Sequence, residues 1–288
     1  MTTFIPKVTQ LSPRIIRVLG CNPGHMTLQG TNTYLIGTGK KRVLLDTGEE
    51  NNSEYISNLM KVLKEHNTNI EQIIISHWHL DHIGGLTDVI NQLSSPVKAS
   101  KYPLEYSDDD VDDYLSDFEL TSLEDKHEIK IEGATLKVHH TPGHTTDHII
   151  LELLEENAVF SGDCILGEGT AIFEDLHSYI NSLHKILKVA PATIYPGHGP
   201  VIDDPVDRIK HYITHRNMRE QQIVETLKAN SDKPLTSMEI VKIIYKDIPE
   251  HLHPAADINV QHHLSKLLKD KVASESDDKW SINIHSSI

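Results

Sequence analysis

The sequence predicts an α/β (α+β) fold arranged as a four-layer αββα sandwich. Short apolar runs bounded by turn residues recur from residue 14 to residue 195, and they follow the order strands, helix, strands, helix. This order indicates two similar halves, in which each sheet carries its helices on the outer face. After Pro205 the pattern changes to helices followed by one short hairpin. We therefore expect two domains, at residues 1–203 and 204–288.

Three apolar runs in the first half predict the strands of a meander, at residues 14–19, 31–36 and 42–46. A helix follows, for which Ser53 is the expected N-cap. Residues 70–75, which end in three consecutive isoleucines, are typical of a strand buried on both faces. Another helix is expected at about residues 86–93.

The second half repeats this arrangement. Four strands are expected, at residues 128–131, 135–140, 148–154 and 158–160. A helix at about residues 178–188 and a strand at residues 193–195 complete the half. Each half thus supplies one sheet and its covering helices.

The C-terminal region has its own pattern. Pro205 can begin a helix that runs to about Ala229 and is the most basic helix expected in the chain. Thr236 and Glu239 predict a capping box for the next helix. Two further elements are expected, a helix at about residues 254–269 and a hairpin at residues 272–284. Helix, helix and hairpin in this order resemble a winged-helix module, which often binds nucleic acid.

Three histidines and one aspartate directly follow the predicted buried strand: His77, His79, Asp81 and His82. Alternate residues at an extended strand end point the same way, so His77 and His79 can face one point in space. The turn after them can bring Asp81 and His82 to a second point nearby. Imidazole and carboxylate groups are zinc ligands, and a catalytic zinc usually keeps one position open for water. The motif therefore suggests a metal-dependent hydrolase.

Three more residues of metal-binding type lie on glycine-containing turns at later strand ends: His144, Asp163 and His198. Glycine lets the backbone turn tightly while one ligand-type side chain is exposed. A single histidine beside Pro-Gly is most often a surface or core residue. Several such turns after the first motif favour one shared metal site.

The composition argues against several classes of protein. The 288 residues carry a net charge of −15, from 42 acidic and 27 basic residues, which argues against a protein that coats nucleic acid. No apolar run reaches the roughly 18–20 residues of a membrane span, so we expect no membrane partner. Cys21 and Cys164 lie far apart in the sequence. We therefore expect no disulfide-linked partner and a reducing compartment.

Two segments carry charge of one sign. Asp46 is the first acidic residue, so the first 45 residues contain bases but no acid. Such a leader can be a mitochondrial transit peptide, but we favour the interpretation that residues 14–18 form the first strand. Residues 105–119 contain eight acids and no base. We interpret them as a solvated loop, with calcium binding as the alternative.

Asp46 at a strand end, the segment 77–82, His144, Asp163 and His198 together resemble the five motifs of the metallo-β-lactamase fold hydrolases. Three more segments extend the resemblance to an animal branch of this family and to nearly the whole chain: Gly20–Gly24, Gln29–Tyr34 and Ser161–Gly167. That branch implies an endoribonuclease of the mitochondrial matrix that cleaves single-stranded RNA. The cytoplasm is the alternative location.

The resemblance also implies how the residues divide between two Zn²⁺ ions per chain. One ion would be held by His77, His79 and His144, and the other by Asp81, His82 and His198. Asp163 would bridge both ions. Asp46 would orient a ligand histidine as a hydrogen-bond acceptor instead of binding metal itself.

Two metal ions roughly 3.5–4 Å apart would convert a water between them into a bridging hydroxide near neutral pH and would polarise the scissile group. Asp81 would accept a hydrogen bond from this nucleophile as well as bind metal. Three histidines are candidates for the general acid: His25, His140 and His148. We expect Cys21 and Cys164 to be small hydrophobic residues and not nucleophiles.

The bridging carboxylate narrows the substrate class, because the antibiotic-degrading members of the fold generally lack it. We rank lactam hydrolysis below hydrolysis of phosphodiesters or thioesters. An endoribonuclease is the first hypothesis, and a thioester hydrolase of the glyoxalase II type is the alternative, which suits the net charge of −15 better. A non-catalytic binding protein is the least consistent with a complete ligand set. For the C-terminal helices, two interpretations are open: a lid that covers one side of the cleft, or a surface that binds nucleic acid. We favour the lid, and we interpret the charges on these helices as a solvated face.

Overall fold

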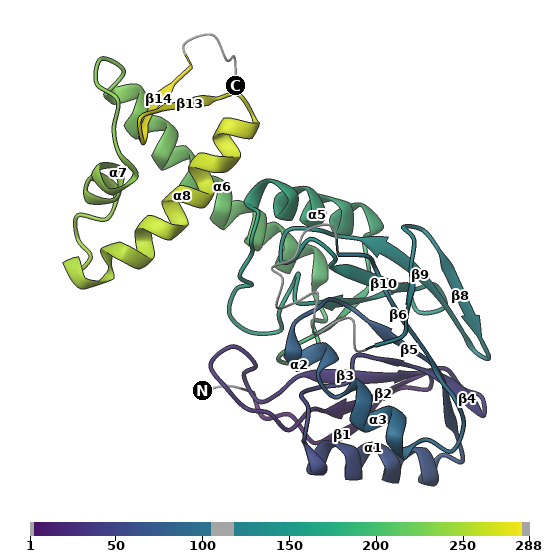
Figure 1. Cartoon of the computed structure of the whole chain (residues 1–288). Helices are drawn as coiled ribbons and strands as arrows, with labels where there is room; N and C mark the ends of the chain where they lie inside the picture. Colours follow the sequence, from purple (N-terminus) through teal and green to yellow (C-terminus); the bar gives the residue numbers. More distant parts are fainter. Residues whose placement is uncertain (1–2, 105–117, 284–288) are drawn as a thin grey trace.

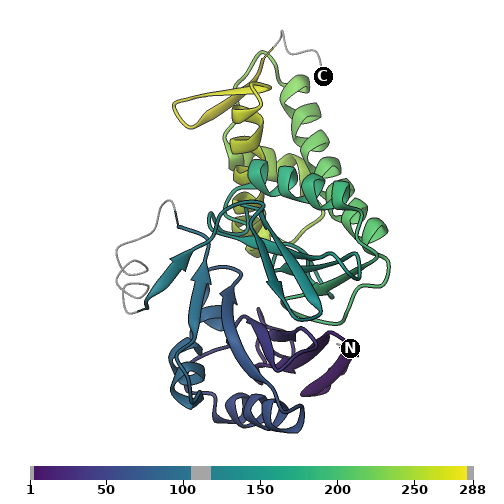
Figure 2. The same cartoon turned by 90° about the vertical axis from the view of Figure 1, so that its right-hand side faces the viewer.

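Two sheets stacked face to face form the inner layers of the molecule. The computed structural model describes residues 3–104 and 118–283. One sheet has seven strands and the other has five, and helices cover their outer faces (Figures 1 and 2). The predicted four-layer αββα sandwich is therefore confirmed. A helical unit with a two-stranded sheet follows it.

The seven strands of the first sheet follow chain order from one edge to the other. Their bounds are β1 Val8–Ser12, β2 Ile15–Leu19, β3 Asn32–Ile36, β4 Lys41–Leu45, β5 Asn69–Ile75, β6 Lys98–Lys101 and β7 Leu120–Ser122. Strands β1 to β4 are antiparallel to their neighbours, whereas β4 to β7 run parallel. Parallel neighbours need crossover connections, which explains the helices between β4 and β6.

Consecutive residues of β5 enter opposite layers of the core. Ile74 packs between the sheets, whereas Ile73 and Ile75 pack under the helices on the outer face. Side chains alternate along a strand, so a strand covered on both faces needs apolar residues at successive positions. The predicted buried strand is thus present. Strands β1, β6 and β7 were not predicted, because they are short and rich in polar residues.

Helices on the outer face of the first sheet are α1 Ser53–Glu65, α2 Leu80–Ile83 and α3 Leu86–Gln92. The prediction that Ser53 caps α1 was wrong by one residue. The side chain of Asn52 accepts a hydrogen bond from the backbone N–H of Tyr55 at 3.0 Å. Asparagine and serine cap helices about equally well, so composition alone does not choose between neighbours.

The second sheet has the order β12-β11-β10-β9-β8. Its strands are β8 Glu128–Ile131, β9 Ala134–His140, β10 Ile149–Leu153, β11 Ala158–Gly162 and β12 Thr193–Pro196. Helix α5 (Leu176–Val189) covers the outer face and is capped by Asp175, which accepts from the Ser178 N–H. All five predicted strands are present, within two residues of the predicted bounds.

The C-terminal unit contains α6 Pro205–Ala229, α7 Ser237–Ile244, the short 3₁₀ helix Glu250–Leu252, α8 His253–Lys269 and the hairpin β13 Ala273–Ser276 and β14 Lys279–Ile282. The predicted capping box is confirmed, since Thr236 and Glu239 exchange their side-chain and backbone hydrogen bonds. The order helix, helix, hairpin is that of a winged-helix module.

Helix α6 contributes to two cores. Ile209 and Tyr212 pack with α5 and the second sheet, whereas Ile223 and Leu227 pack with the other C-terminal elements. The predicted boundary between residues 203 and 204 lies directly before this helix. The two cores therefore meet within α6 itself.

The arginines of α6 are used inside the fold. Arg208 donates to the carbonyl oxygens of Leu166 and Gly169, at 3.0 and 2.8 Å. Arg216 is buried, and Arg219 lies 4.2 Å from the ring centroid of Tyr245. The interpretation of these charges as a solvated face was therefore wrong for Arg208 and Arg216, because a guanidinium can stack on a ring and donate several hydrogen bonds at once. Arg219 is half-exposed.

Several expectations concern the chain as a whole. Residues 14–18 belong almost entirely to β2, as the strand interpretation predicts. In the described ranges, no helix combines the length and apolarity that a membrane crossing requires. Cys21 and Cys164 are free. Most of the acidic segment 105–119 lies outside the described residues, so its assignment as a loop or a calcium site stays a prediction.

A buried ion pair joins the two sheets beside the loop that carries His144. Lys101 Nζ lies 2.6 Å from Asp147 Oδ2, and both side chains are at least 96% buried. Thr145 Oγ1 donates to the other oxygen of Asp147 at 2.7 Å. A buried ion pair needs both partners, because a single buried charge is strongly unfavourable.

We predict that Asp147→Ala lowers the free energy of unfolding by about 3–5 kcal/mol, since it leaves the Lys101 ammonium buried and unpaired. Adding Lys101→Met to this variant should recover part of the loss. Denaturant unfolding of the three proteins measures both effects. A double variant less stable than Asp147→Ala would show that the buried charge is not the cause.

Candidate metal centre

Strand ends from both sheets converge on one point. Asp46 follows β4, and residues 77–82 follow β5 and enter α2. The other three residues lie after β9, β11 and β12: His144, Asp163 and His198. Ligand sites in α/β folds form where strand ends meet, because loops there can turn inward without disturbing the sheets. All seven expected ligand residues are brought together, in two groups.

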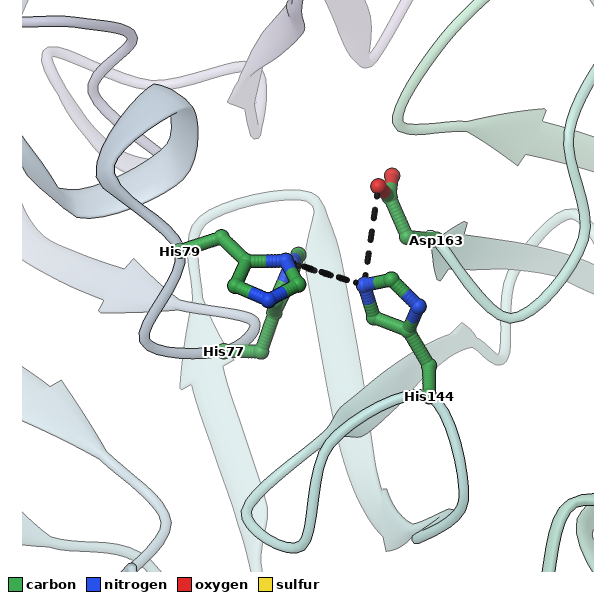
Figure 3. A group of neighbouring side chains, drawn as sticks. All are labelled: His77, His79, His144 and Asp163. Carbon is green, nitrogen blue, oxygen red and sulfur yellow. Dashed lines mark hydrogen bonds and ion pairs between the residues drawn. The ribbon is translucent and has the colours of Figure 1, made fainter. Parts of the chain in front are cut away.

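The first group contains three histidines and one aspartate, shown in Figure 3. His77 Nε2 lies 3.0 Å from His79 Nδ1, and His144 Nε2 lies 3.2 and 3.1 Å from these two atoms. Nitrogens bound to one tetrahedral zinc at about 2.0–2.1 Å are roughly 3.3 Å apart. The triangle therefore has the dimensions of a metal site.

The second group is Asp81, His82 and His198. His82 Nε2 lies 3.4 Å from His198 Nε2. Asp81 Oδ2 is 3.2 Å from His82 Nε2 and 3.1 Å from His198 Nε2. These distances also fit one tetrahedral ion.

Asp163 lies between the two groups. Its Oδ2 is 3.3 Å from His198 Nε2 and 3.7 Å from His144 Nε2, while its Oδ1 is 3.4 Å from His82 Nε2. Close packing keeps it there, because a Cβ at Gly197 would approach Asp163 Oδ1 to 2.4 Å. Only glycine fits at position 197 without displacing this carboxylate.

Carbonyl and carboxylate groups outside the cluster fix the orientation of two imidazoles. His144 Nδ1 donates to the carbonyl oxygen of Ile172 at 2.8 Å, and His82 Nδ1 lies 2.7 Å from Asp46 Oδ2. A neutral imidazole that donates through Nδ1 presents the lone pair of Nε2 to the centre. Asp46 also accepts from the backbone N–H and the hydroxyl of Ser76, which hold the carboxylate in place.

The site combines neutral histidines with a region that stabilises positive charge. Burial and the neighbouring His144 lower the pKa of His79 to about 4. Burial also opposes the charged form of His198, but Asp163 and Asp81 outweigh it and raise the pKa of His198 to about 9. The same pairing holds the pKa of Asp163 well below its usual range, although burial acts in the opposite direction. Histidine nitrogens opposed by two carboxylates are a donor set suited to a divalent cation.

A cavity of about 430 Å³ opens onto both groups. The two groups supply five of its lining residues: His79, Asp81, His144, Asp163 and His198. One wall is mostly apolar and is formed by Met26, Leu28, Leu166, Ala171, Ile172 and Phe173, with Glu168 and Glu174 beside it. Segment 166–174 thus covers one side of the site. The C-terminal helices pack against that segment and do not line the cavity, so the expectation that they form the lid themselves was wrong.

One of the three expected general-acid candidates reaches the cavity. His25 is exposed and lines the mouth. His140 Nε2 donates to the carbonyl of Thr146, and its ring stacks on Tyr102. His148 is fully buried, and its Nε2 accepts from the backbone N–H of Asp163 at 3.1 Å. His148 does not line the cavity, so this buried ring supports the fold of the site and does not reach a substrate there.

The cysteines have no place in the site. Cys164 is fully buried in the core under α5, and burial raises the pKa of its thiol. Cys21 is partly buried, and burial likewise raises its pKa. Neither lines the cavity. The interpretation of Cys164 as a small buried hydrophobe is confirmed.

Two residues without a predicted role, Thr31 and Asn32, hold the site together. Thr31 Oγ1 donates to Asp81 Oδ2 at 3.1 Å. Asn32 Nδ2 donates to the carbonyls of Pro196 and Gly199, both at 2.9 Å, and ties the His198 loop to the first sheet. The sequence feature that could have identified them is the polar triplet Thr31-Asn32-Thr33 at the start of an otherwise apolar strand, since buried polar groups need partners.

Comparison with known proteins agrees with this architecture. Residues 26–198 match the metallo-beta-lactamase superfamily, and residues 236–280 match the beta-lactamase associated winged helix domain. The chain is 46% identical over 282 residues to a Beta-lactamase-like protein 2 homolog of Drosophila melanogaster, which covers 96% of each chain.

Two further similarities come from a fungus and a bacterium. An atrochrysone carboxyl ACP thioesterase of Aspergillus fumigatus is 35% identical over 254 residues, covering 85% of this chain and 78% of the fungal one. The crystal structure of a beta-lactamase domain protein from Burkholderia ambifaria superposes with a TM-score of 0.76 at 18% identity, covering 96% and 93% of the two chains. The chain thus belongs to the metallo-β-lactamase superfamily and carries the winged-helix domain associated with that superfamily.

Proposed function

We propose that this hydrolase is a metal-dependent endoribonuclease that cleaves single-stranded RNA with two zinc ions. The position of Asp163 carries the proposal, because its oxygens lie within 3.3–3.7 Å of histidines from both groups. A carboxylate shared between adjacent metal sites is suited to displacement at a phosphodiester, where charge develops on the attacking and the leaving oxygen. The animal branch that the sequence resembles adds RNA as the substrate.

Each residue of the site has a defined part in this proposal. One zinc ion would be held by His77, His79 and His144, the other by Asp81, His82 and His198, and Asp163 would contact both. Bound zinc ions acidify water and neutralise charge that develops on the scissile group. Asp46 and Ile172 O keep His82 and His144 in the tautomer that a ligand needs.

Two side chains would interact with protons of the reacting groups, one on the attacking water and one on the leaving group. Asp81 lines the cavity and would accept a hydrogen bond from the attacking water. His25 lies at the mouth and would protonate the leaving ribose oxygen. Its exposure keeps the imidazole in contact with solvent, so it can recover a proton between turnovers.

The apolar wall supports a second candidate, a thioester hydrolase of the glyoxalase II type. Leu166, Ile172 and Phe173 offer an acyl chain a water-excluding surface beside the candidate metal sites. Glu168 and Glu174 would repel a polyanion more than a small acyl thioester. The fungal relative whose name is that of a thioesterase points the same way.

The resemblance to the animal branch of the family leads us to propose the mitochondrial matrix as the site of action, with the cytoplasm as the alternative. Fractionation of cells that express the chain with a C-terminal tag distinguishes the two. Protection of the tag from added protease in intact mitochondria is the expected result.

We predict that the zinc-loaded protein cleaves labelled single-stranded RNA and leaves S-lactoylglutathione intact. Gel analysis of the RNA and absorbance of the thioester report the two reactions, and a zinc-free sample is the control. Thioester cleavage with intact RNA would overturn the nuclease proposal in favour of the second candidate.

Replacement of Asp81 should separate chemistry from folding. We predict that Asp81→Asn lowers the cleavage rate by at least about 100-fold, because the variant loses a charged ligand and a hydrogen-bond acceptor for the attacking water. The midpoint of thermal unfolding of the zinc-free protein should change little. Unimpaired cleavage by this variant would exclude the two-metal mechanism.

Zinc should stabilise the folded protein. At a free zinc concentration of 100 times the dissociation constant, binding at one site adds about 2.7 kcal/mol to the free energy of unfolding. We predict a raised unfolding temperature when zinc is added to chelator-treated protein, and a smaller rise for His198→Ala. His177→Ala, which changes a half-exposed histidine paired with Asp270, serves as the control and should behave like the wild type. An identical rise in the His198→Ala variant would argue against this ligand set.

A further inference from the structure

Segment 171–175 links the C-terminal unit to the candidate metal centre. On one side, the carbonyl of Ile172 accepts the hydrogen bond of His144 Nδ1 at 2.8 Å. The backbone N–H of Glu174 donates to the carbonyl of Gly143, also at 2.8 Å. The loop that carries His144 is therefore bound to this segment through both side chain and backbone.

On its other side, the same segment is held by α6 and α8. Arg216 of α6 donates through Nη2 to the carbonyl of Ala171 at 3.1 Å. Its guanidinium carbon lies 5.0 Å from the ring centroid of Phe173, and the ring of His262 from α8 meets that ring edge-on at 5.2 Å. Phe173 is 7% exposed. Contacts from the C-terminal unit thus flank Ile172 on both sides in sequence.

The burial of Arg216 makes this contact structurally demanding. The residue is 8% exposed, although a guanidinium loses hydration when it is buried. A carbonyl acceptor and an aromatic face compensate part of this loss, because both interact favourably with a cation. Arg216 therefore has a strong preference for one arrangement of Ala171 and Phe173.

We propose that Arg216 is a positioning residue for the first metal site. It holds residues 171 and 173 so that the carbonyl of Ile172 stays in reach of His144 Nδ1. Loss of that hydrogen bond frees the imidazole to rotate and to exchange tautomers, and zinc then binds less tightly. The winged-helix unit is in this way part of the support of the metal centre, a role that rests on the zinc sites of the proposed function but not on the identity of the substrate.

The position predicts an asymmetric effect on the two ions. His144 belongs to the group with His77 and His79, whereas Arg216 has no contact path of this kind to Asp81, His82 and His198 among the interactions described above. Mutation of a group that orients a metal ligand typically lowers metal affinity by about 10–100-fold. For a residue that acts through a backbone segment, we expect about a tenfold loss, confined to one of the two zinc ions.

The test is a competition titration of zinc against a chromophoric chelator. Arg216→Met keeps much of the side-chain volume but removes the donor and the charge. Arg219→Met is the matched control, because Arg219 lies on the same helix and stacks on Tyr245 within the C-terminal unit. We expect one zinc ion to bind about tenfold more weakly to Arg216→Met and both to bind normally to Arg219→Met. Arg216→Lys, which keeps one donor, should restore part of the affinity.

Two further measurements keep the inference falsifiable. The cobalt-loaded Arg216→Met protein should show altered visible absorption, since the bands report the ligand environment, while its far-ultraviolet circular dichroism stays that of the wild type. Phe173→Leu should weaken the binding of the same zinc ion. The Arg216→Met/Phe173→Leu double variant should lose less binding free energy than the sum of the two single losses, because both residues act through one segment.

The outcomes separate the inference from the proposed function. Wild-type protein that binds no zinc would overturn both. Wild-type protein that binds two zinc ions, together with an Arg216→Met variant that binds both equally well, would overturn the positioning role alone. If Arg216→Met lowers the affinity for both zinc ions equally, or loses the wild-type circular dichroism, Arg216 acts through general stability and the positioning role is overturned.

Discussion

Seven donor groups from two different sheets have to meet within a few ångströms, and the rest of the structure depends on that constraint. The ligand atoms of His77, His79, His144 and Asp163 lie within 4.8 Å of one another, and so do those of Asp81, His82 and His198. Such precision needs the sheets locked together at this end. The side chain of Asn32 in the first sheet donates to two carbonyls of the His198 loop, and the Tyr34 hydroxyl donates to Pro196 O at 2.7 Å. Because these groups are buried, slippage between the sheets would leave polar atoms unpaired.

The centre of the fold was predictable because local and global signals agree there. The isoleucines of β5 require burial on both faces, and the histidine motif follows them directly. The grouping of the seven residues was predictable only with the family resemblance, since strand ends far apart in the sequence do not reveal which of them meet. Strands β1, β6 and β7 were not predicted because they are short and rich in polar residues; β6, Lys-Ala-Ser-Lys, has no apolar pattern. Its terminal lysine is buried only because Asp147, a residue of the other sheet's loop, faces it.

Tertiary partners explain the other differences between prediction and structure. Among the three histidines considered as acids, His140 and His148 each lie four positions from His144, yet the His148 ring supports the backbone of Asp163. The basic character of α6 suggested a surface for solvent or nucleic acid. Instead, Arg208 and Arg216 bind carbonyls of segment 166–171, and this use of charge depends on contacts between residues 39 to 45 positions apart. Sequence pattern alone cannot distinguish an arginine that faces solvent from one that binds a carbonyl.

We propose that the seven residues hold two adjacent ions with Asp163 between them. Crystals grown with zinc and measured on both sides of the zinc absorption edge test it most directly, because the anomalous difference map locates each ion without reference to activity. We expect two peaks, one beside His77, His79 and His144 and the other beside Asp81, His82 and His198, roughly 3.5–4 Å apart. A single peak, or ions bound away from Asp163, would contradict it.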